Sequence, residues 1–379
     1  MLTWVEISKS SLIFNIRQIR KAIGPNVKLL SVVKANAYGH GVAEVTKIIQ
    51  PQTDWFGVAS LAEALKLRKL NVKKPILVLS FYELEKNAIK TAIKKNIALV
   101  VYSLNQVKTI EKVAGSLGQK ANVHLKVDSG TSRLGVMPNQ IPEFLKRVKK
   151  CKNLRLTGIF SHLADSEENV AYTKKQLAVF EQIRRLCLNY RPPLIQHIAC
   201  SAASVLYPSS RYDLVRTGIM LYGLHPSKKT NHAPNARDYV GRHIRLKPVL
   251  TWKTKIIQIK ELPPHTYVGY GLSFKTRKRT KLAVLPVGYA DGYDRKLSNN
   301  GQVLIKGKRA RVIGRVCMNM MMVDASGIAA REGDEVVLLG SQKQAVVSAE
   351  ELAEKIGTIN YEVVTRINWE LPRVVISGK

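Results

Sequence analysis

A lysine that follows a short apolar segment offers the clearest chemistry in this chain. Residues 28–33 (KLLSVV) are largely apolar, and Lys34 comes next, ahead of the small residues 35–41 (ANAYGHG). Short apolar runs bounded by turn residues are typical of interior strands. A lysine after such a strand lies at the carboxyl edge of a parallel sheet, where α/β folds place their chemistry. A partly desolvated amine there can form an imine with an aldehyde such as pyridoxal phosphate.

Other polar residues recur at the ends of the apolar runs in the first 225 residues. A single buried histidine is most often structural, but these residues share one position relative to their runs. Barrel enzymes assemble their sites from several strand ends at one face. We therefore predict that they belong to the same site as Lys34. They are Lys126, Asp128, His162, His197, Ser201 and Arg216.

Eight apolar runs alternate with helix-forming segments in this part of the chain. Such alternation predicts a parallel sheet covered on both faces, and eight repeats favour a closed (β/α)8 TIM-like barrel. A doubly wound open sheet is the alternative, although no Gly-x-Gly-x-x-Gly pattern follows any run. The predicted strands are 28–33, 55–60, 75–80, 97–103, 121–128, 155–162, 194–201 and 214–222, with helices such as 61–68 and 171–188 between them.

The pattern changes after residue 236. Residues 231–242 are polar and resemble a linker, and strands of alternating polarity follow, separated by turns. We predict a barrel domain over 1–236 and a mostly-β domain over 237–379. Ser348, followed by Glu351, predicts the start of a helix. The expected strands of the second domain are 249–260, 281–286, 303–306, 312–323 and 336–339.

The composition is that of an ordinary globular protein. Of the 379 residues, 45% are hydrophobic and 23% charged, and no apolar run is long enough to span a bilayer. The N-terminus lacks the pattern of a secretion signal, so we expect a cytoplasmic protein. The cysteines lie far apart without metal-ligand spacing, and we expect reduced thiols and no metal site. They are Cys151, Cys187, Cys200 and Cys317.

The net charge of +34 is unusual, with 61 Lys and Arg against 27 Asp and Glu. Such a balance is typical of proteins that bind nucleic acids or anionic surfaces. The charge is spread through the chain, however, and its densest runs, 146–152 and 275–281, lie in expected connections without a nucleic-acid-binding motif. We therefore expect weak, nonspecific polyanion binding and no specific nucleic-acid partner.

Residues 32–41 (VVKANAYGHG) resemble the cofactor-lysine motif of the alanine racemases. The resemblance continues over nearly the whole chain, and it implies pyridoxal phosphate bound to Lys34 as an imine. It also implies interconversion of L- and D-alanine, which supplies D-alanine for peptidoglycan, by a homodimer. In that dimer, Tyr270 of one subunit reaches the Lys34 site of the other. The further motifs are 126–136 (KVDSGTSRLGV), 197–203 (HIACSAA), 215–219 (VRTGI), 267–271 (YVGYG), 288–293 (GYADGY), 314–318 (GRVCM) and 359–364 (INYEVV).

The resemblance assigns Lys34 and Tyr270 as the two catalytic bases. Inversion of an α-carbon removes a proton from one face and returns one to the other, which two opposed bases do without large motion. Arg216 beside the pyridine nitrogen stays charged, disfavours protonation of the ring and so limits side reactions such as transamination. Cofactor contacts are implied for Tyr38, Arg133, His162, Ser201, Arg216, Gly218, Ile219 and Tyr361, substrate contacts for Arg133 and Met318, and a carbamate for Lys126.

Three positions depart from the family's pattern. Cys200 replaces the usual Asn, Thr217 the usual Pro, and Asn319 a common Asp, so one negative charge near the site is missing. Two alternatives stay open. One is a racemase of broader specificity that also accepts serine. The other is a pyridoxal-phosphate carrier on a single barrel, against which the second domain and its Tyr270 argue.

Overall fold

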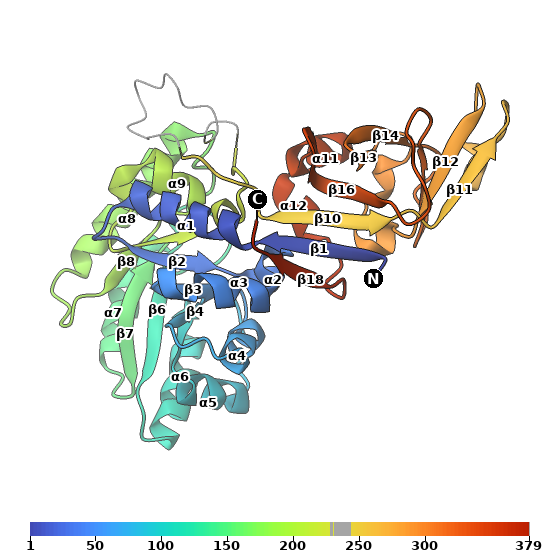
Figure 1. Cartoon of the computed structure of the whole chain (residues 1–379). Helices are drawn as coiled ribbons and strands as arrows, with labels where there is room; N and C mark the ends of the chain where they lie inside the picture. Colours follow the sequence, from blue (N-terminus) through green and yellow to red (C-terminus); the bar gives the residue numbers. More distant parts are fainter. Residues whose placement is uncertain (228–229, 231–243, 379) are drawn as a thin grey trace. The chain divides into compact units, whose positions relative to one another are not determined.

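The computed structural model describes residues 1–227, 230 and 244–378 (Figure 1). The chain forms two compact units. The barrel unit consists of Ile13–Ala35 and Val45–Lys247, and the β-rich unit of Met1–Leu12, Asn36–Glu44 and Pro248–Lys379. The expected domain boundary at residues 236 and 237 and the linker 231–242 lie outside the described residues, so that boundary stays a prediction. The first twelve residues, which we had assigned to the barrel domain, belong to the β-rich unit.

Within the described residues, the barrel unit contains one sheet of eight parallel strands in the order β8-β7-β6-β5-β4-β3-β2-β9 (Figure 1). Two backbone hydrogen bonds join its ends, from Asp213 N to Gln196 O (3.1 Å) and from Arg216 N to Ala199 O (3.0 Å). The predicted barrel is confirmed. The strands are β2 (Lys28–Val32), β3 (Trp55–Val58), β4 (Ile76–Val78), β5 (Ile97–Val101), β6 (Ala121–Lys126), β7 (Leu154–Phe160), β8 (Ile195–His197) and β9 (Leu214–Thr217).

Helices connect these strands, and local sequence sets several of their first residues. Ser60 and Glu63 form a capping box at the start of α4, and Ser103 and Gln106 form one at the start of α6. The two helices expected over 61–68 and 171–188 are confirmed as α4 and α8. The helices up to residue 206 are α1 (Lys9–Ile23), α2 (Lys34–Tyr38), α3 (Val42–Ile49), α4 (Leu61–Lys69), α5 (Lys86–Lys94), α6 (Leu104–Ser116), α7 (Ile141–Lys149), α8 (Val170–Leu186) and α9 (Ser201–Leu206).

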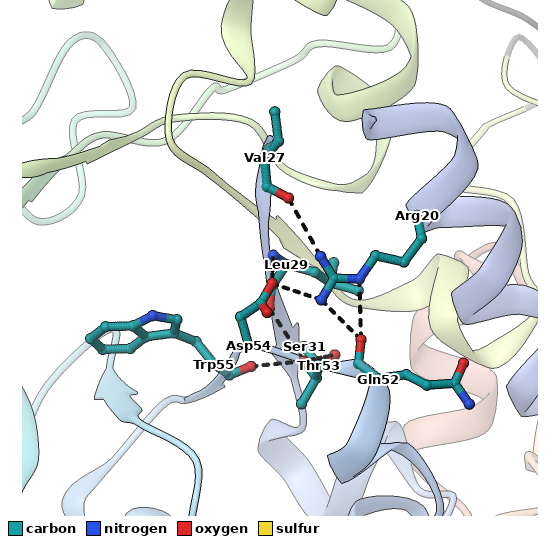
Figure 2. Close-up of polar contacts among 8 residues, drawn as sticks. All are labelled: Arg20, Val27, Leu29, Ser31, Gln52, Thr53, Asp54 and Trp55. Carbon is teal, nitrogen blue, oxygen red and sulfur yellow. Dashed lines mark hydrogen bonds and ion pairs between the residues drawn. The ribbon is translucent and has the colours of Figure 1, made fainter. Parts of the chain in front are cut away.

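A network of hydrogen bonds at the start of β2 fixes the strand that leads to Lys34 (Figure 2). The Asp54 carboxylate accepts from the Arg20 guanidinium and from the Leu29 backbone N–H, both at 2.7 Å. The hydroxyls of Ser31 and Thr53 lie 2.7 Å apart, and Thr53 also donates to the Leu29 carbonyl at 3.2 Å. Because Ser31 and Thr53 are buried, their mutual hydrogen bond satisfies groups that would otherwise be desolvated without a partner.

The β-rich unit is built on a largely antiparallel sheet in the order β11-β12-β15-β14-β13-β16-β10-β1-β18, with β17 beside β16. The N-terminal strand pairs with β10 antiparallel and with β18 parallel, which explains why the first residues belong to this unit. The strands are β1 (Thr3–Ser8), β10 (Leu250–Lys255), β11 (Gln258–Leu262), β12 (Thr280–Leu285), β13 (Gln302–Ile305), β14 (Lys308–Val312), β15 (Met321–Asp324), β16 (Glu335–Gln342), β17 (Ala345–Val347) and β18 (Arg373–Ile376).

Two of the expected strands are each divided in the structure. The segment 249–260 forms β10 and β11, because Ile256 N bonds to Asp334 O while Ile257 N bonds to Val284 O, so the chain changes its partner. Of the segment 312–323, only Val312, the last residue of β14, and residues 321–323 of β15 lie in strands; residues 313–320 connect them, and Gly314 there has a φ of +77°. The division of 249–260 therefore follows from a change of pairing, whereas residues 313–320 contain a glycine in the left-handed region, a local signal for a turn.

The helix expected after Ser348 is confirmed as α11 (Ala349–Ile356). The Ser348 side chain accepts a hydrogen bond from Glu351 N at 3.1 Å, and Gly357 ends the helix with a φ of +76°. A further helix, α12 (Asn360–Thr365), follows. Among the described residues, no helix combines the length and apolar character needed to cross a membrane.

Candidate active site

Lys34 follows β2 and begins the short helical segment α2. The ladder of β2 extends through Val33, whose N–H donates to Gly57 O at 2.9 Å. Burial lowers the pKa of the Lys34 amine, and the positive charge of Arg133 lowers it further, while Glu63 opposes both. Glu63 also accepts a hydrogen bond from Ala35 N at 2.6 Å. A larger share of this amine is therefore neutral and nucleophilic near neutral pH than for a lysine whose pKa is not shifted.

The backbone after Lys34 is left-handed. Four consecutive residues that are not glycine, from Ala35 to Tyr38, have φ between +51° and +56°. Each such residue costs about 1–2 kcal/mol. Backbone strain of this kind persists only where the surroundings enforce it, and it clusters at functional sites. Sequence patterns indicate a small, flexible segment here but not this conformation.

Contacts within the β-rich unit hold residues 36–44 in place. The Asn36 side chain accepts from Val42 N at 2.9 Å, and the Arg373 guanidinium donates twice to Gly39 O, at 2.9 and 3.2 Å. Gly39 has a φ of +81°, and a Cβ there would overlap the Val364 carbonyl. Close packing and donated hydrogen bonds therefore offset the strain.

Two residues predicted to contact the cofactor lie together in the β-rich unit. The rings of Tyr38 and Tyr361 have centroids 6.2 Å apart and are tilted by 50°. Tyr38 is 9% exposed. They come from α2 and α12, which are more than 300 positions apart in sequence, so only the fold brings them together.

The segment that carries Arg133 is shaped by one carboxylate. Asp128 Oδ1 accepts from the N–H groups of Gly130, Thr131 and Ser132 at 2.9–3.0 Å, and Oδ2 accepts from Arg133 N at 3.1 Å. Burial alone would raise the pKa of Asp128, but these four N–H groups hold it below its usual value. Asp128 therefore stays ionised and fixes the backbone at Arg133.

Lys126 is 4% exposed. Burial lowers the pKa of its amine to about 8, and the charges of Arg216 and Arg133 contribute to this. The amine donates to Leu79 O at 3.3 Å. A carbamate forms only from a neutral amine, so this environment favours that modification, which stays a prediction.

Arg216 is buried and donates to four acceptors. One terminal nitrogen donates to His197 Nδ1 at 2.7 Å. The other donates to Ser161 O at 2.7 Å and Ile198 O at 2.9 Å, and lies 3.3 Å from His162 Nδ1. Burial lowers the pKa of Arg216 to about 10, so it remains charged at neutral pH. Burial and this charge hold the pKa values of His162 and His197 well below normal, so both rings are neutral.

Ser201 connects the two segments predicted to bind phosphate. Its hydroxyl accepts a hydrogen bond from Gly218 N at 2.9 Å. Ser201 begins α9, and Gly218 precedes the 3-10 helix Ile219–Tyr222. Hydroxyls and clustered backbone N–H groups at helix starts bind anions well. The predicted phosphate residues of the barrel unit, Ser201, Gly218 and Ile219, are thus neighbours.

Tyr270 and Met318 have a different setting, because both lie in the β-rich unit and are exposed by 72% and 56%. Tyr270 begins a 3-10 turn (Tyr270–Leu272) between Gly269 and Gly271, which have φ of +71° and +68°. A Cβ at Gly271 would lie 2.7 Å from the Arg315 guanidinium carbon. Both glycines are therefore needed for the turn that presents Tyr270.

The sequence comparisons agree with this arrangement. Residues 7–226 match the family model described as alanine racemase, N-terminal domain, and residues 249–375 match that of the alanine racemase C-terminal domain. The chain belongs to the alanine racemase family. The alanine racemase of Halothermothrix orenii is 41% identical to it, over 98% of this chain and 96% of the relative. That of Methanococcus maripaludis is 38% identical, over 98% of each chain.

Solved alanine racemase structures are similar over almost the entire chain. The enzyme of Clostridium difficile 630 superposes with a TM-score of 0.90 at 36% identity, over 99% of this chain and 96% of that one. The alanine racemase of Bacillus anthracis with bound L-Ala-P gives 0.89 at 33% identity, over 99% and 95%. Both units of the present fold are therefore those of the family.

Alanine racemases depend on pyridoxal phosphate, and the donor set of the barrel unit fits that cofactor. It includes the Lys34 amine for an aldehyde, a hydroxyl with neighbouring N–H groups for a phosphate, and a charged guanidinium that can only donate hydrogen bonds. The sequence patterns assign no role to Glu63, Ser161 or His124, which the structure places beside candidate site residues. The position of Glu63 could have been noticed from the sequence, because a Glu three residues after a Ser is the pattern of a capping box at the start of a helix.

Proposed function

We propose that this chain interconverts L- and D-alanine with Lys34 and Tyr270 as its two bases. The observation that carries the proposal is the Lys34 amine, whose pKa is lowered at the carboxyl end of a barrel strand, in a chain that matches both family domains. Pyridoxal phosphate, when bound, supplies an electron sink for the bonds of the substrate's α-carbon. The protein supplies position, charge and proton transfer.

The cofactor would be held by groups described above. Lys34 would bind its aldehyde carbon, and the Arg216 guanidinium would face its pyridine nitrogen. Because all hydrogen-bonding groups of Arg216 are donors, that nitrogen would accept a hydrogen bond and stay unprotonated. The phosphate would be bound by Ser201 and the N–H groups of Gly218 and Ile219. The family resemblance further assigns Tyr38 to the phosphate, Tyr361 to the cofactor, and Arg133 and Met318 to the substrate.

The two bases would act at opposite faces of the α-carbon. Lys34 Nζ would exchange the proton of D-alanine and Tyr270 Oη that of L-alanine. His162 supports this assignment, because its Nδ1 faces Arg216 and must therefore accept a hydrogen bond. The proton of this neutral ring is then on Nε2, from which it can be donated to a phenolic oxygen. Such a donor would stabilise the phenolate of Tyr270 and make the phenol a better acid.

The active form would be a homodimer in which Tyr270 of one subunit completes the Lys34 site of the other. Large apolar and aromatic side chains are exposed on the β-rich unit, and one of them, Leu272, lies in the same turn as Tyr270. Such residues are enriched at protein interfaces and are disfavoured in contact with water. They are Leu272 (62% exposed), Met318 (56%), Met320 (48%), Tyr289 (43%) and Trp369 (59%).

We propose the cytoplasm as the working compartment. All four cysteines lie in the described part of the chain, and they form no disulfide. Burial raises the pKa of the Cys187 thiol to about 11 and raises that of Cys200. These thiols are therefore poorly ionised and suit a reducing compartment.

The test is circular dichroism of alanine incubated with the purified protein. Starting from either pure enantiomer, the signal should decay to zero, because the equilibrium of a racemase is the racemate. A protein that leaves both enantiomers unchanged after addition of pyridoxal phosphate would exclude the proposal and favour a carrier. Parallel reactions with L- and D-serine decide the alternative of broader specificity, which requires comparable kcat/KM for serine and alanine.

A further inference from the structure

A chain of hydrogen bonds leads from Arg216 further into the barrel through two histidines. Arg216 donates to His197 Nδ1 at 2.7 Å, and His197 Nε2 lies 3.0 Å from His124 Nδ1. Both histidines are completely buried. His124 lies on β6, two residues before Lys126, and it touches neither of the candidate bases in any recorded hydrogen bond or ring contact of the described residues.

The direction of this chain follows from Arg216 alone. A guanidinium can only donate, so His197 Nδ1 must accept and the proton of the neutral ring must be on Nε2. That N–H then donates to His124 Nδ1, which must also be an acceptor. Burial lowers the pKa of His124 to about 3, and burial holds that of His197 well below normal, so neither ring is charged. Each ring therefore has one defined tautomer.

The barrel provides a fitted space for both rings. Gly158 on β7 is in register with His124, and a Cβ at Gly158 would overlap the His124 ring. Phe160 stacks on His197 with centroids 4.8 Å apart and an interplanar angle of 3°, and Trp55 lies against His124 with centroids 5.6 Å apart. The two rings therefore have little freedom to rotate, and their hydrogen bonds are preorganised.

His124 is a costly residue for stability alone. Its Nε2 is buried without a hydrogen-bond partner in the described residues. By the tautomer argument this atom carries a proton, and a buried donor without an acceptor destabilises a fold. An apolar side chain would avoid that cost, as the neighbouring barrel residues Val123 and Leu125 do. A histidine at position 124 is therefore explained by what its Nδ1 does, which is to accept a hydrogen bond from His197.

We propose that His124 is a positioning residue, whose Nδ1 holds His197 in the Nε2–H tautomer and thereby keeps the Arg216 guanidinium in its place. This proposal rests on the proposed function in one respect, namely that Arg216 faces the cofactor. Without the His124 acceptor, the His197 Nε2–H would be buried and unpaired. His197 could then avoid that cost by changing its tautomer, which would turn a donor toward the Arg216 donor and displace the guanidinium.

Two substitutions separate this role from simple packing. His124→Leu removes the acceptor, whereas His124→Asn places an amide oxygen near the position of Nδ1. We expect kcat for alanine to fall roughly tenfold in the leucine variant, the equivalent of about one hydrogen bond, with KM within about twofold. The asparagine variant should recover most of kcat, although it fills the space less well than leucine.

Histidine 15N spectra of the full chain provide a readout that does not depend on activity. They are recorded with cofactor bound and again after its removal, with His197→Asn to assign the His197 signals. In the parent protein and in His124→Asn, His197 should be protonated on Nε2 in both states. In His124→Leu, part of the His197 population should be protonated on Nδ1.

Three results would overturn the proposed role of His124. A parent protein with His197 protonated on Nδ1, or charged at neutral pH, overturns the proposal even if neither variant folds. A leucine variant with unchanged tautomer and kcat overturns it as well, and so does an asparagine variant as impaired as the leucine variant. Absence of racemisation in the parent protein refutes the proposed function instead, and leaves the tautomer measurement valid.

Discussion

Some of the candidate residues in the two units differ sharply in their exposure to solvent. In the barrel unit, Lys126, His197 and Arg216 are exposed by 6% or less, and Arg216 and His197 are fixed by hydrogen bonds inside that unit. In the β-rich unit, Tyr270 and Met318 are more than half exposed. The barrel therefore supplies the hydrogen-bond partners of its buried arginine itself, whereas the β-rich unit leaves Tyr270 and Met318 open to solvent.

Physical cost explains the difference. A buried guanidinium requires several acceptors, so its fold must supply them from fixed strand ends. A phenol at the surface needs only a turn of the right shape, which the two glycines beside Tyr270 provide. We therefore expect changes in the barrel to affect cofactor binding, and changes in the β-rich unit to affect turnover or assembly.

The largest effect should come from Lys34→Ala in the barrel unit. This variant loses the amine that binds the aldehyde, so the bound-cofactor absorbance of the purified protein should vanish and racemisation should fall below detection. Lys108→Ala, on the exposed face of α6, is the control and should keep both. A yellow and active Lys34→Ala protein would assign the cofactor lysine elsewhere.

Tyr270→Phe is the corresponding change in the β-rich unit, and it should leave the cofactor absorbance intact. Racemisation should fall by roughly 10²–10⁴-fold, the range for loss of a positioned general base. In deuterated water the variant should still exchange the α-proton of D-alanine faster than that of L-alanine. Tyr267→Phe, in the same segment and 50% exposed, is the control. Equal loss of exchange from both enantiomers would contradict the assignment of two bases.

Gly39→Ala tests the strained segment after Lys34. Alanine at a φ of +81° is strained and would also overlap the Val364 carbonyl, so we expect the free energy of unfolding to fall by about 3 kcal/mol or more. Gly24 has a similar φ of +86° with open space around it, and Gly24→Ala should cost only about 1 kcal/mol. Urea denaturation compares the two variants, and equal losses would mean that the overlap relaxes without cost.

Mixing two inactive variants tests whether Lys34 of one subunit and Tyr270 of the other form one active site. If Lys34→Ala and Tyr270→Phe are denatured together and refolded, half of the dimers combine both chains and contain one intact site. Roughly a quarter of the parent activity should return. Each variant refolded alone is the control. No recovery from a mixture that does form mixed dimers would show that both bases of a site come from one chain.

The smallest effect is a pH shift from Arg133→Met. The Arg133 charge lowers the pKa of Lys34, so its removal should raise that pKa and reduce the neutral amine at any pH below it. The rate at which pyridoxal phosphate rebinds to cofactor-free protein should then reach half its plateau at higher pH than in the parent. Arg155→Met, exposed on β7, should leave the profile unchanged.

Much of the barrel was predictable because its signals are local. The eight apolar strands and the caps at Ser60 and Ser348 can be identified from neighbouring residues, and so can the lysine at the end of β2. The family motifs supplied the rest of the candidate site. In contrast, the pairing of β1 with β10 and β18 depends on residues more than 240 positions away, and no local pattern indicates it.

The hydrogen-bonded histidines were not predictable for the same reason. His124 has an ordinary strand context, and its contact with His197 follows from barrel register and from the space left by Gly158. The left-handed backbone from Ala35 to Tyr38 leads directly into Gly39, whose carbonyl accepts hydrogen bonds from Arg373 near the other end of the chain. Long-range packing decides these features.

The chain passes between the two units four times, and one passage occurs between Ala35 and Asn36, one residue after Lys34. Each unit is therefore built from separate segments of the chain, and dividing the chain once near residue 240 would not separate the two units. A barrel fragment that begins at residue 1 and stops there would carry an orphaned strand, β1, and would lose Arg373, which anchors the segment after the lysine. The proposed cofactor lysine and the point at which the chain passes from one unit to the other are therefore separated by a single residue, Ala35.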